Sequence, residues 1–387
     1  MRRGRSRGDP GAAGSAPGRP DLHGSAGPGA ERPEVHPARP RRLRRSPLRY
    51  LTASVLVLVV SLLLLVQAGA SGTHPRSETS PGSRPSCTTT FRVAFVADVA
   101  GLRSSVDAAG WRGVDQAVGT LACAHADLAL PARPSEYRRT LQAYAGHDLV
   151  IAGSFLLTDA VVEIARANPA THFVLVDPIV TPPDVKNLAV LTFRSDQAAF
   201  LAGALAAIVT RTGVVAGVYG PDGPMDRANR LGFEQGARYV RPGVRVLGAY
   251  QPAGSAPYAD PDWGAGQARA FVREHADVIF GAGGTTGQGA LLAAAQSGVA
   301  CINEDLVASS DPSCVIATSV KFVERGVRMA VAGAIAGPWQ GGVQTLDIGQ
   351  GAVGLSLRND PLLTSDVAQR VLTIADLLAA GSISVSP

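Results

Sequence analysis

Three carboxylates and a glycine-rich loop stand at the ends of short apolar runs, where they could hold a small polar ligand. Asp98 ends the run FRVAFVAD, Asp177 ends HFVLVD and Asp305 ends ACINED, while ADVIFGAGG continues through Gly283 and Gly284. Carboxylates accept hydrogen bonds from hydroxyl groups or act as acid and base, and glycines let a backbone approach a ligand closely. The alternative is that these residues only turn the chain and cap the next helix.

The residues needed for covalent or metal-assisted catalysis do not accompany these acids. The sequence has no H-E-x-x-H, C-x-x-C or G-x-S-x-G motif, and its histidines are scattered. The glycine-rich loop is not a P-loop, because no lysine follows it. These observations favour a binding site over an active site. We therefore expect a protein that is not an enzyme and that uses no metal or cofactor.

Lysine usage singles out one cation. Of the 36 basic residues only Lys186 and Lys321 are lysines, and Lys321 lies in ATSVKFVERG, between an apolar run and a helical pattern. A compact ammonium group makes a point contact with a ligand oxygen, which a planar guanidinium replaces poorly. The alternative is a solvent-exposed lysine at the start of a helix. We expect Lys321 to contact the ligand.

The elements that must position these residues follow an alternating pattern. The apolar runs lack polar alternation, which is typical of parallel strands buried on both faces, and helical stretches separate most of them. Two successive sets predict an α/β fold of two Rossmann-like lobes, with ligands in the crevice beyond the strand ends. We expect residues 89–193 and 320–340 in lobe 1, and residues 194–319 and 341–387 in lobe 2.

Charge is unevenly distributed along the chain. Residues 1–50 contain 12 arginines and 4 acidic residues, and they are rich in Pro, Gly and Ala, so we expect a disordered basic arm on the cytoplasmic side. The remainder has 24 basic residues against 27 acidic residues, a formal charge of −3. This slightly acidic part lacks the electrostatic footprint of a nucleic-acid-binding protein.

Residues 51–70 form an uncharged apolar segment long enough to cross a bilayer, and arginines precede it. The segment ends in an A-x-A-like signal at Ala68 to Ala70, so a transmembrane anchor and a cleaved signal peptide both fit. Residues 71–88 are expected to form a linker. In either case residues 71–387 lie outside the cytoplasm, on a single-pass anchor or secreted after cleavage behind Ala70.

Export permits disulfides, and the four cysteines stand near the starts of apolar runs. Neighbouring parallel strands would bring Cys87 close to Cys123 and Cys301 close to Cys314, because each pair would meet at one sheet edge. We therefore expect the pairs Cys87–Cys123 and Cys301–Cys314. Two other pairings, or free buried thiols, remain as alternatives.

A series of stretches resembles the basic membrane protein family, the nucleoside-binding components of ABC importers with a type I periplasmic-binding-protein fold. In chain order they are VADVAGL with Trp111 downstream, GSFLLTDAVVEIARANPATHFVLVD, NLAVLTFRSDQAAFLAGALAA, LGFEQGARYVRPGVRVL, DVIFGAGGTTGQG, the NED of ACINEDL, TSVKFVERGV and GGVQTLDIGQGAVGLSL. The series covers most of the exported part, and it appears in the family's order.

The resemblance implies which residues hold the ligand. In the family an Asp and a Lys hold the ribose hydroxyls, and aromatic rings stack on the base; Asp305 and Lys321 match the first two positions. The positions that match the family's ligand contacts are Asp98, Asp177, Tyr258, Gly283, Gly284, Asp305 and Lys321.

The chain departs from the family at Ser105-Val106-Asp107, where Ser-Phe-Asn is usual. Val106 cannot stack on a base as Phe does, and such stacking is worth roughly 1 to 3 kcal/mol. An ionised Asp107 accepts hydrogen bonds but does not donate them as Asn does. We expect both residues to lie at the ligand and to recognise a polar edge that differs from the family's.

The expected function is capture of a nucleoside-like molecule by closure of two lobes, for delivery to an ABC permease and its ATPase. The alternative is a membrane-anchored receptor with the same fold, which signals ligand occupancy and feeds no transporter. Attachment to the membrane would run through residues 51–70, and no nucleic acid is involved.

Overall fold

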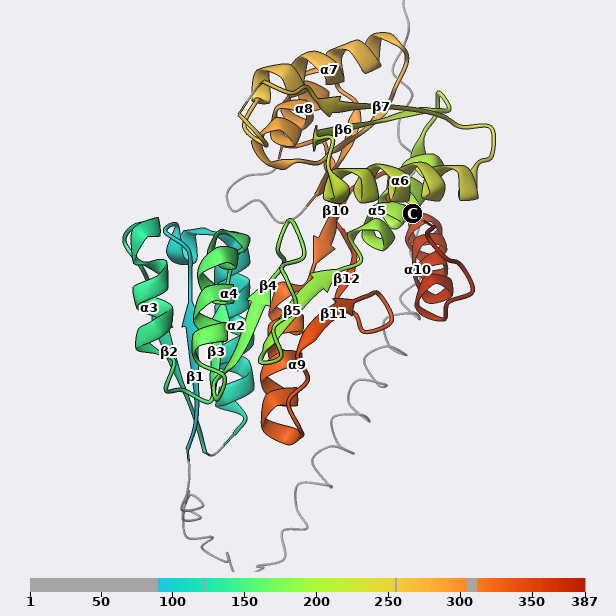
Figure 1. Cartoon of the computed structure of the whole chain (residues 1–387). Coiled ribbons are helices and arrows are strands. Elements are labelled where there is room, and N and C mark those ends of the chain that lie inside the picture. The colour runs from blue at the N-terminus through green and yellow to red at the C-terminus, as the bar shows by residue number, and fades with distance from the viewer. Residues whose placement is uncertain (1–89, 122, 255, 305–311, 387) are drawn as a thin grey trace, which may run out of the picture. The chain divides into compact units, whose positions relative to one another are not determined.

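The described part of the chain folds into two α/β lobes, each built on its own sheet (Figure 1). The computed structural model describes residues 90–121, 123–254, 256–304 and 312–386. The predicted arm, apolar segment and linker lie outside these ranges. Within them, no helix combines the length and the apolar character that crossing a bilayer requires.

The first sheet is parallel throughout. Its strands are β1 (Phe91–Val96), β2 (Ala124–Ala129), β3 (Leu149–Ala152), β4 (His172–Val176), β5 (Leu188–Phe193) and β11 (Gly342–Leu346), in the order β11-β5-β4-β3-β1-β2. Successive residues of a strand point to opposite faces. Val93 and Phe95 of β1 belong to one buried cluster, and Ala94 and Val96 belong to another. Apolar runs without polar alternation thus form strands that are buried on both sides.

Helices cover both faces of this sheet. They are α2 (Ser105–Gly119) and α9 (Val323–Ala336) on one face, and α3 (Tyr137–Ala143) and α4 (Thr158–Ala167) on the other. The short 3-10 turns η1 (Gly101–Arg103), η2 (Pro134–Glu136) and η3 (Phe155–Leu157) lead into α2, α3 and α4. Ser104 fixes the start of α2, because its Oγ accepts a hydrogen bond from the Asp107 N–H at 3.3 Å.

The second sheet repeats this plan with one reversed edge strand. Its strands are β6 (Val214–Pro221), β7 (Arg245–Gln251), β8 (Val278–Gly281), β9 (Ala300–Glu304), β10 (Val315–Lys321) and β12 (Val353–Leu357), in the order β12-β10-β9-β8-β6-β7. The strand β12 runs antiparallel to β10, and the other pairs are parallel. The first strand of each lobe therefore lies between the second and the third.

The helices of the second lobe pack closely. They are α5 (Ser195–Val209), α6 (Pro224–Val240), α7 (Pro261–Arg273), α8 (Gly284–Gln296) and α10 (Ser365–Ala379). A Cβ on Gly203 of α5 would lie 1.9 Å from the Phe233 carbonyl oxygen of α6. Only glycine permits this approach of two helices. The α5–α6 pair covers one face of the sheet, and α7 and α8 cover the other.

The chain passes between the two sheets three times: after β5, after β10 and after β11 (Figure 1). Hydrogen bonds tie these passages together, with Arg194 N–H donating to the Leu346 oxygen at 2.8 Å and Phe322 N–H donating to the Ala352 oxygen at 2.8 Å. The expected lobe boundaries need a correction here. The strand β11 was expected in lobe 2 but pairs with β5 in the first sheet, because the chain passes to the second sheet for the last time only after Leu346. Lys321 was expected in lobe 1 but ends β10 of the second sheet.

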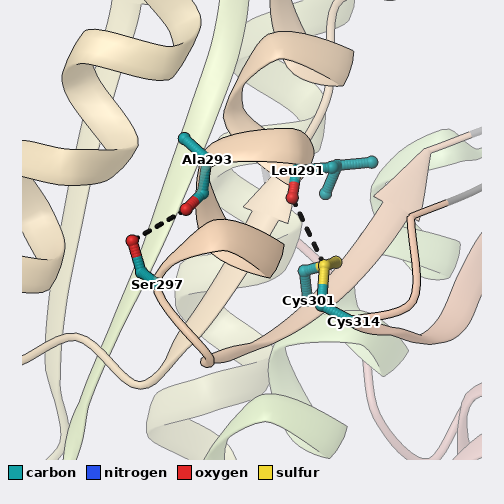
Figure 2. Close-up of a disulfide and its surroundings, with 5 residues drawn as sticks. All are labelled: Leu291, Ala293, Ser297, Cys301 and Cys314. Carbon is teal, nitrogen blue, oxygen red and sulfur yellow. Dashed lines mark hydrogen bonds between the residues drawn. A yellow bond between two sulfur atoms is a disulfide. The ribbon is translucent and has the colours of Figure 1, made fainter.

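A disulfide joins Cys301 to Cys314, the pair expected from their positions (Figure 2). Cys301 lies in β9 and pairs in register with Val315 of β10, so the neighbouring Cys314 comes within 5.2 Å of it, Cα to Cα. The Cys314 Sγ lies 3.3 Å from the Leu291 carbonyl oxygen of α8. Cys123 is also disulfide-bonded, and its expected partner Cys87 lies outside the described residues.

Replacing both cysteines of this bond, Cys301→Ser with Cys314→Ser, should lower the free energy of unfolding by about 3 kcal/mol, because a cross-link over a loop of this length restricts the unfolded chain. Urea unfolding without reductant measures the loss. Ser297→Ala is the matched control: it removes only the 2.7 Å bond from Ser297 Oγ to the Ala293 oxygen at the end of α8 (Figure 2) and should cost under about 1 kcal/mol. Equal stability of the double variant and the wild type would contradict this account.

Candidate ligand-binding site

In both sheets the first strand lies between the second and the third, where the strand order reverses, and open α/β sheets bind ligands in the crevice beyond the carboxyl ends of the strands at such a point. In the first lobe Asp98 follows β1, and Asp177 follows β4. In the second lobe Gly283 follows β8, and Lys321 ends β10. These four residues, all singled out in the sequence, therefore lie at the carboxyl ends of strands.

An ion pair joins the strand ends of the two lobes. The Lys321 Nζ donates a hydrogen bond to the Asp177 Oδ2 at 2.8 Å. The two side chains are only 9% and 21% exposed, so water competes weakly for either charge. Asp177 adopts a left-handed backbone with a φ of 47°. This conformation is uncommon outside glycine and occurs often at functional sites.

In the first lobe the Asp107 carboxyl group is buried beneath the strand ends. Its Oδ2 accepts a hydrogen bond from the Asp98 N–H at 3.1 Å. Its Oδ1 is buried without a hydrogen-bond partner among the described residues, and a Cβ on Gly153 would lie 2.3 Å from that oxygen. The side chain is fully buried and holds the backbone of Asp98, and the expected contact of Asp107 with the ligand stays a prediction.

Burial raises the pKa of Asp107 to about 7, and the nearby Asp98 carboxylate adds to the rise, while the hydrogen bond from the Asp98 N–H opposes it. Asp98 is itself almost buried, and its Oδ1 accepts a hydrogen bond from the Ala100 N–H at 2.6 Å. The two acids thus fix the loop that follows β1 and leads into α2.

Asp226 takes the same place in the second lobe. Each of these buried acids is the third residue of the helix that follows its lobe's first strand. The Asp226 Oδ1 accepts a hydrogen bond from the Gly220 N–H at 2.8 Å, as Asp107 does from Asp98. Asp226 is fully buried, and burial raises its pKa to about 6. The two lobes therefore fix their first strand ends by one shared device.

Tyr258 lies on this second strand end. A Cβ on Gly220 would lie 2.5 Å from the Tyr258 ring, so glycine leaves the room that the ring occupies. The Tyr258 carbonyl oxygen accepts hydrogen bonds from the N–H and the Oγ1 of Thr285, both at 3.0 Å. Burial and the nearby Asp226 charge raise the pKa of Tyr258 to about 12, so its hydroxyl stays protonated at neutral pH.

Glu304 holds the glycine-rich loop. Its Oε2 accepts a hydrogen bond from the Gly283 N–H at 2.9 Å, and its Oε1 accepts one from the Asn229 amide. Gly283 has a φ of 88°, and a Cβ on it would lie 2.2 Å from the Gly220 nitrogen. Both facts require glycine. In this structure the loop thus brings the ends of β6 and β8 together.

The predicted residues fall into three groups. Val106 and Lys321 line one hollow of about 250 Å³, and Lys321 also meets Asp177. Gly283 and Gly284 pack against Gly220 and Tyr258, respectively. Asp98 contacts Asp107, and Asp305 lies outside the described residues. The positive charge of Lys321 lowers the pKa of both Asp226 and Tyr258, which indicates that the first two groups lie near each other.

Sequence reasoning missed Asp226, Asn229 and Glu304. One signal was present, since Asp226 and Asn229 stand three residues apart at the start of a helix and so share a face. Glu304 directly precedes Asp305 but is hidden among polar residues of a strand end. Within the described part of the chain, no group of three His, Cys, Asp or Glu side chains could hold a metal ion.

Asp107→Asn should flatten part of the pH dependence of folding. The pKa of Asp107 is 3.8 in the unfolded chain and about 7 in the folded one, so the folded state binds more protons between these values. The free energy of unfolding therefore falls as the pH rises through this interval, by up to about 1.4 kcal/mol per pH unit. The variant keeps a weaker pH dependence of the same sign, because Asp226 also has a raised pKa in the folded state.

Urea unfolding at several pH values checks this prediction. Asp115→Asn, an exposed change on the same helix, should keep the wild-type slope. Identical slopes for Asp107→Asn and the wild type would show that Asp107 is not held protonated by the fold.

Comparison with known proteins assigns the chain to a family. A family model described as ABC transporter substrate-binding protein PnrA-like matches residues 132–384. Basic membrane protein A of Borreliella burgdorferi is 28% identical over 234 residues, which cover 59% of this chain and 67% of the relative. Basic membrane protein B of Borrelia garinii subsp. bavariensis is 33% identical over 156 residues, which cover 40% of this chain and 44% of the relative.

A solved structure shares the fold. An ABC transporter solute-binding protein from Conexibacter woesei DSM 14684 superposes with a TM-score of 0.63 at 20% identity, over 77% of this chain and 99% of that protein. The family model spans more than half of the chain and confirms the resemblance seen in the sequence. The chain belongs to the PnrA-like family of ABC transporter substrate-binding proteins, a family of solute-binding proteins and not of enzymes.

Proposed function

We propose that this protein captures a nucleoside or a similar small polar molecule between its two lobes and delivers it to an ABC permease and its ATPase. The observation that carries the proposal is the ion pair of Lys321 and Asp177. It joins the strand ends of the two lobes, and its charges are largely shielded from water. A ligand held there contacts both lobes at once and thereby favours their closure.

The chemistry of this pair suits a vicinal diol. A ribose hydroxyl donates a hydrogen bond to a carboxylate such as Asp177, and its oxygen accepts one from an ammonium such as Lys321. Hydrogen bonds to charged groups are stronger than those between neutral groups. Hydrogen bonds from a diol can therefore replace part of the attraction between Lys321 and Asp177. Asp305 directly follows Glu304, which holds Gly283, and we propose it as a further acceptor.

The remaining polar groups fit a ligand of modest size. Tyr258 keeps a protonated hydroxyl near Asp226 and offers the edge of an aromatic ring. Asp98 follows β1 in the first lobe, at the same end of the sheet as Asp177. The family match favours transport over a receptor role. We place residues 71–387 outside the cytoplasm, with residues 51–70 as the membrane attachment or the signal.

Mass spectrometry of small molecules released from the purified full chain tests the class of ligand. We expect a nucleoside or a molecule with a comparable diol, at up to one molecule per chain. Recovery of only an amino acid or a metal ion would reject the proposal.

Lys321→Met should weaken binding of the nucleosides adenosine, guanosine, cytidine and uridine by roughly ten- to a hundredfold, since a hydrogen bond to a charged group contributes about 1.5 to 3 kcal/mol. Titration calorimetry measures the change. Lys186→Met is the matched control, because it removes the chain's other lysine from an exposed position. Equal losses in the two variants, or none in either, would remove Lys321 from the site.

A further inference from the structure

A groove runs from the interlobe ion pair along the first turns of α2 and α9. It consists of two adjoining hollows of about 250 Å³ and 490 Å³, which share Ala109, Arg112 and Lys321 among their walls. Val106 lines the smaller hollow, and Phe322 lines the larger one. We call it the α2–α9 groove. Because Lys321 also binds Asp177, the groove opens directly beside the proposed ligand site.

Positive charge dominates its walls. The cations that line it are Arg103, Arg112, Lys321, Arg325 and Arg328, and Glu324 is the acid among its lining residues. Arg112 pairs with Glu324 at 2.8 Å, and Lys321 pairs with Asp177. Among the described residues, the other three arginines have no acidic side chain within 4.0 Å. Three guanidinium groups therefore face the groove without an ion-pair partner in this part of the chain.

The backbone and an exposed ring add to this character. The helix α9 begins at Val323, and no side-chain hydrogen bond caps its N-terminus, so this end of the helix adds a partial positive charge beside the groove. Phe322 is 40% exposed, and its ring lies against Gly354, where a Cβ would be 3.3 Å from the ring. Arg325 lies similarly against Gly351, where a Cβ would be 3.1 Å from the guanidinium carbon. Glycines thus leave room for both groups.

Val106 contributes to the width of the groove. It lines the smaller hollow together with Arg103 and Lys321. A Phe ring there would occupy space beside Lys321. The short side chain instead leaves a path from Lys321 to Arg103.

We infer that the α2–α9 groove is a subsite for an anionic, phosphate-like group of the ligand, so that this chain prefers a nucleoside monophosphate to a neutral nucleoside. The inference rests on the proposed function and narrows its class of ligand. Guanidinium groups bind phosphate through paired, charge-assisted hydrogen bonds. A phosphate in the groove satisfies arginines that otherwise face water, while the sugar stays at Lys321 and Asp177.

Calorimetric titration of the full chain tests this with adenosine, guanosine, cytidine, uridine, their 5′-monophosphates and inorganic phosphate, at one ionic strength. We expect at least one monophosphate to bind roughly tenfold tighter than its nucleoside, a gain typical of added charge-assisted hydrogen bonds. The double variant Arg103→Gln with Arg325→Gln should bring the affinity for the monophosphate down to that for the nucleoside. Arg269→Gln, an exposed arginine of α7, is the matched control and should leave both affinities unchanged.

The outcomes separate the two proposals. Nucleosides that bind at least as tightly as their monophosphates would overturn the anionic subsite and leave the proposed function standing. Binding of inorganic phosphate that the double variant loses, with no binding of any nucleoside or monophosphate, would support the subsite and reject the nucleoside class. If none of these probes binds, the anionic subsite and the nucleoside class of ligand both fall. A preference for monophosphate that survives in the double variant would place the anion elsewhere and overturn the inference.

Discussion

The ion pair between Lys321 and Asp177 is the interaction on which the candidate site depends. Removing two charges from water is costly, and attraction between them recovers that cost only when their geometry is good. Here the Nζ–Oδ2 distance is 2.8 Å, and both side chains are mostly covered. Since the two residues belong to different sheets, the pair resists separation of the lobes at this point. A ligand that binds here must offer both ions new partners.

The rims around the pair are held by buried acids and close backbone contacts. Asp107 and Asp226 each bind the N–H of a strand end, and burial at these positions makes the ionisation of each carboxyl group less favourable. Glu304 adds a third carboxylate that binds the Gly283 N–H. An apolar residue at any of these places would leave a backbone N–H without an acceptor. The acids therefore position the rims of the candidate site.

The sequence predicted the parts of the structure that depend on local pattern. Buried runs without alternation indicated parallel strands, and the positions of Asp177 and Lys321 at run ends indicated that both lie at the carboxyl ends of strands, where they pair between the two sheets. The buried position of Asp107 could not be predicted, because it depends on the absence of a side chain at Gly153, far along the chain. The lobe boundary failed for a similar reason, since nothing in the run VQTLDIG indicates that β11 pairs with β5.

The departure at Val106 is best understood together with the arginines beside it. An aromatic residue at this place would supply stacking, which is tolerant of the base and worth roughly 1 to 3 kcal/mol. Val106 gives up that contribution but leaves the groove open to Arg103 and Lys321. The described part of the chain belongs to a region whose formal charge is negative, so attraction of an anion must come from local cations. Selectivity would then come from the phosphate-like group, because guanidinium groups distinguish an anion from a neutral hydroxyl far better than an aromatic ring distinguishes one base from another.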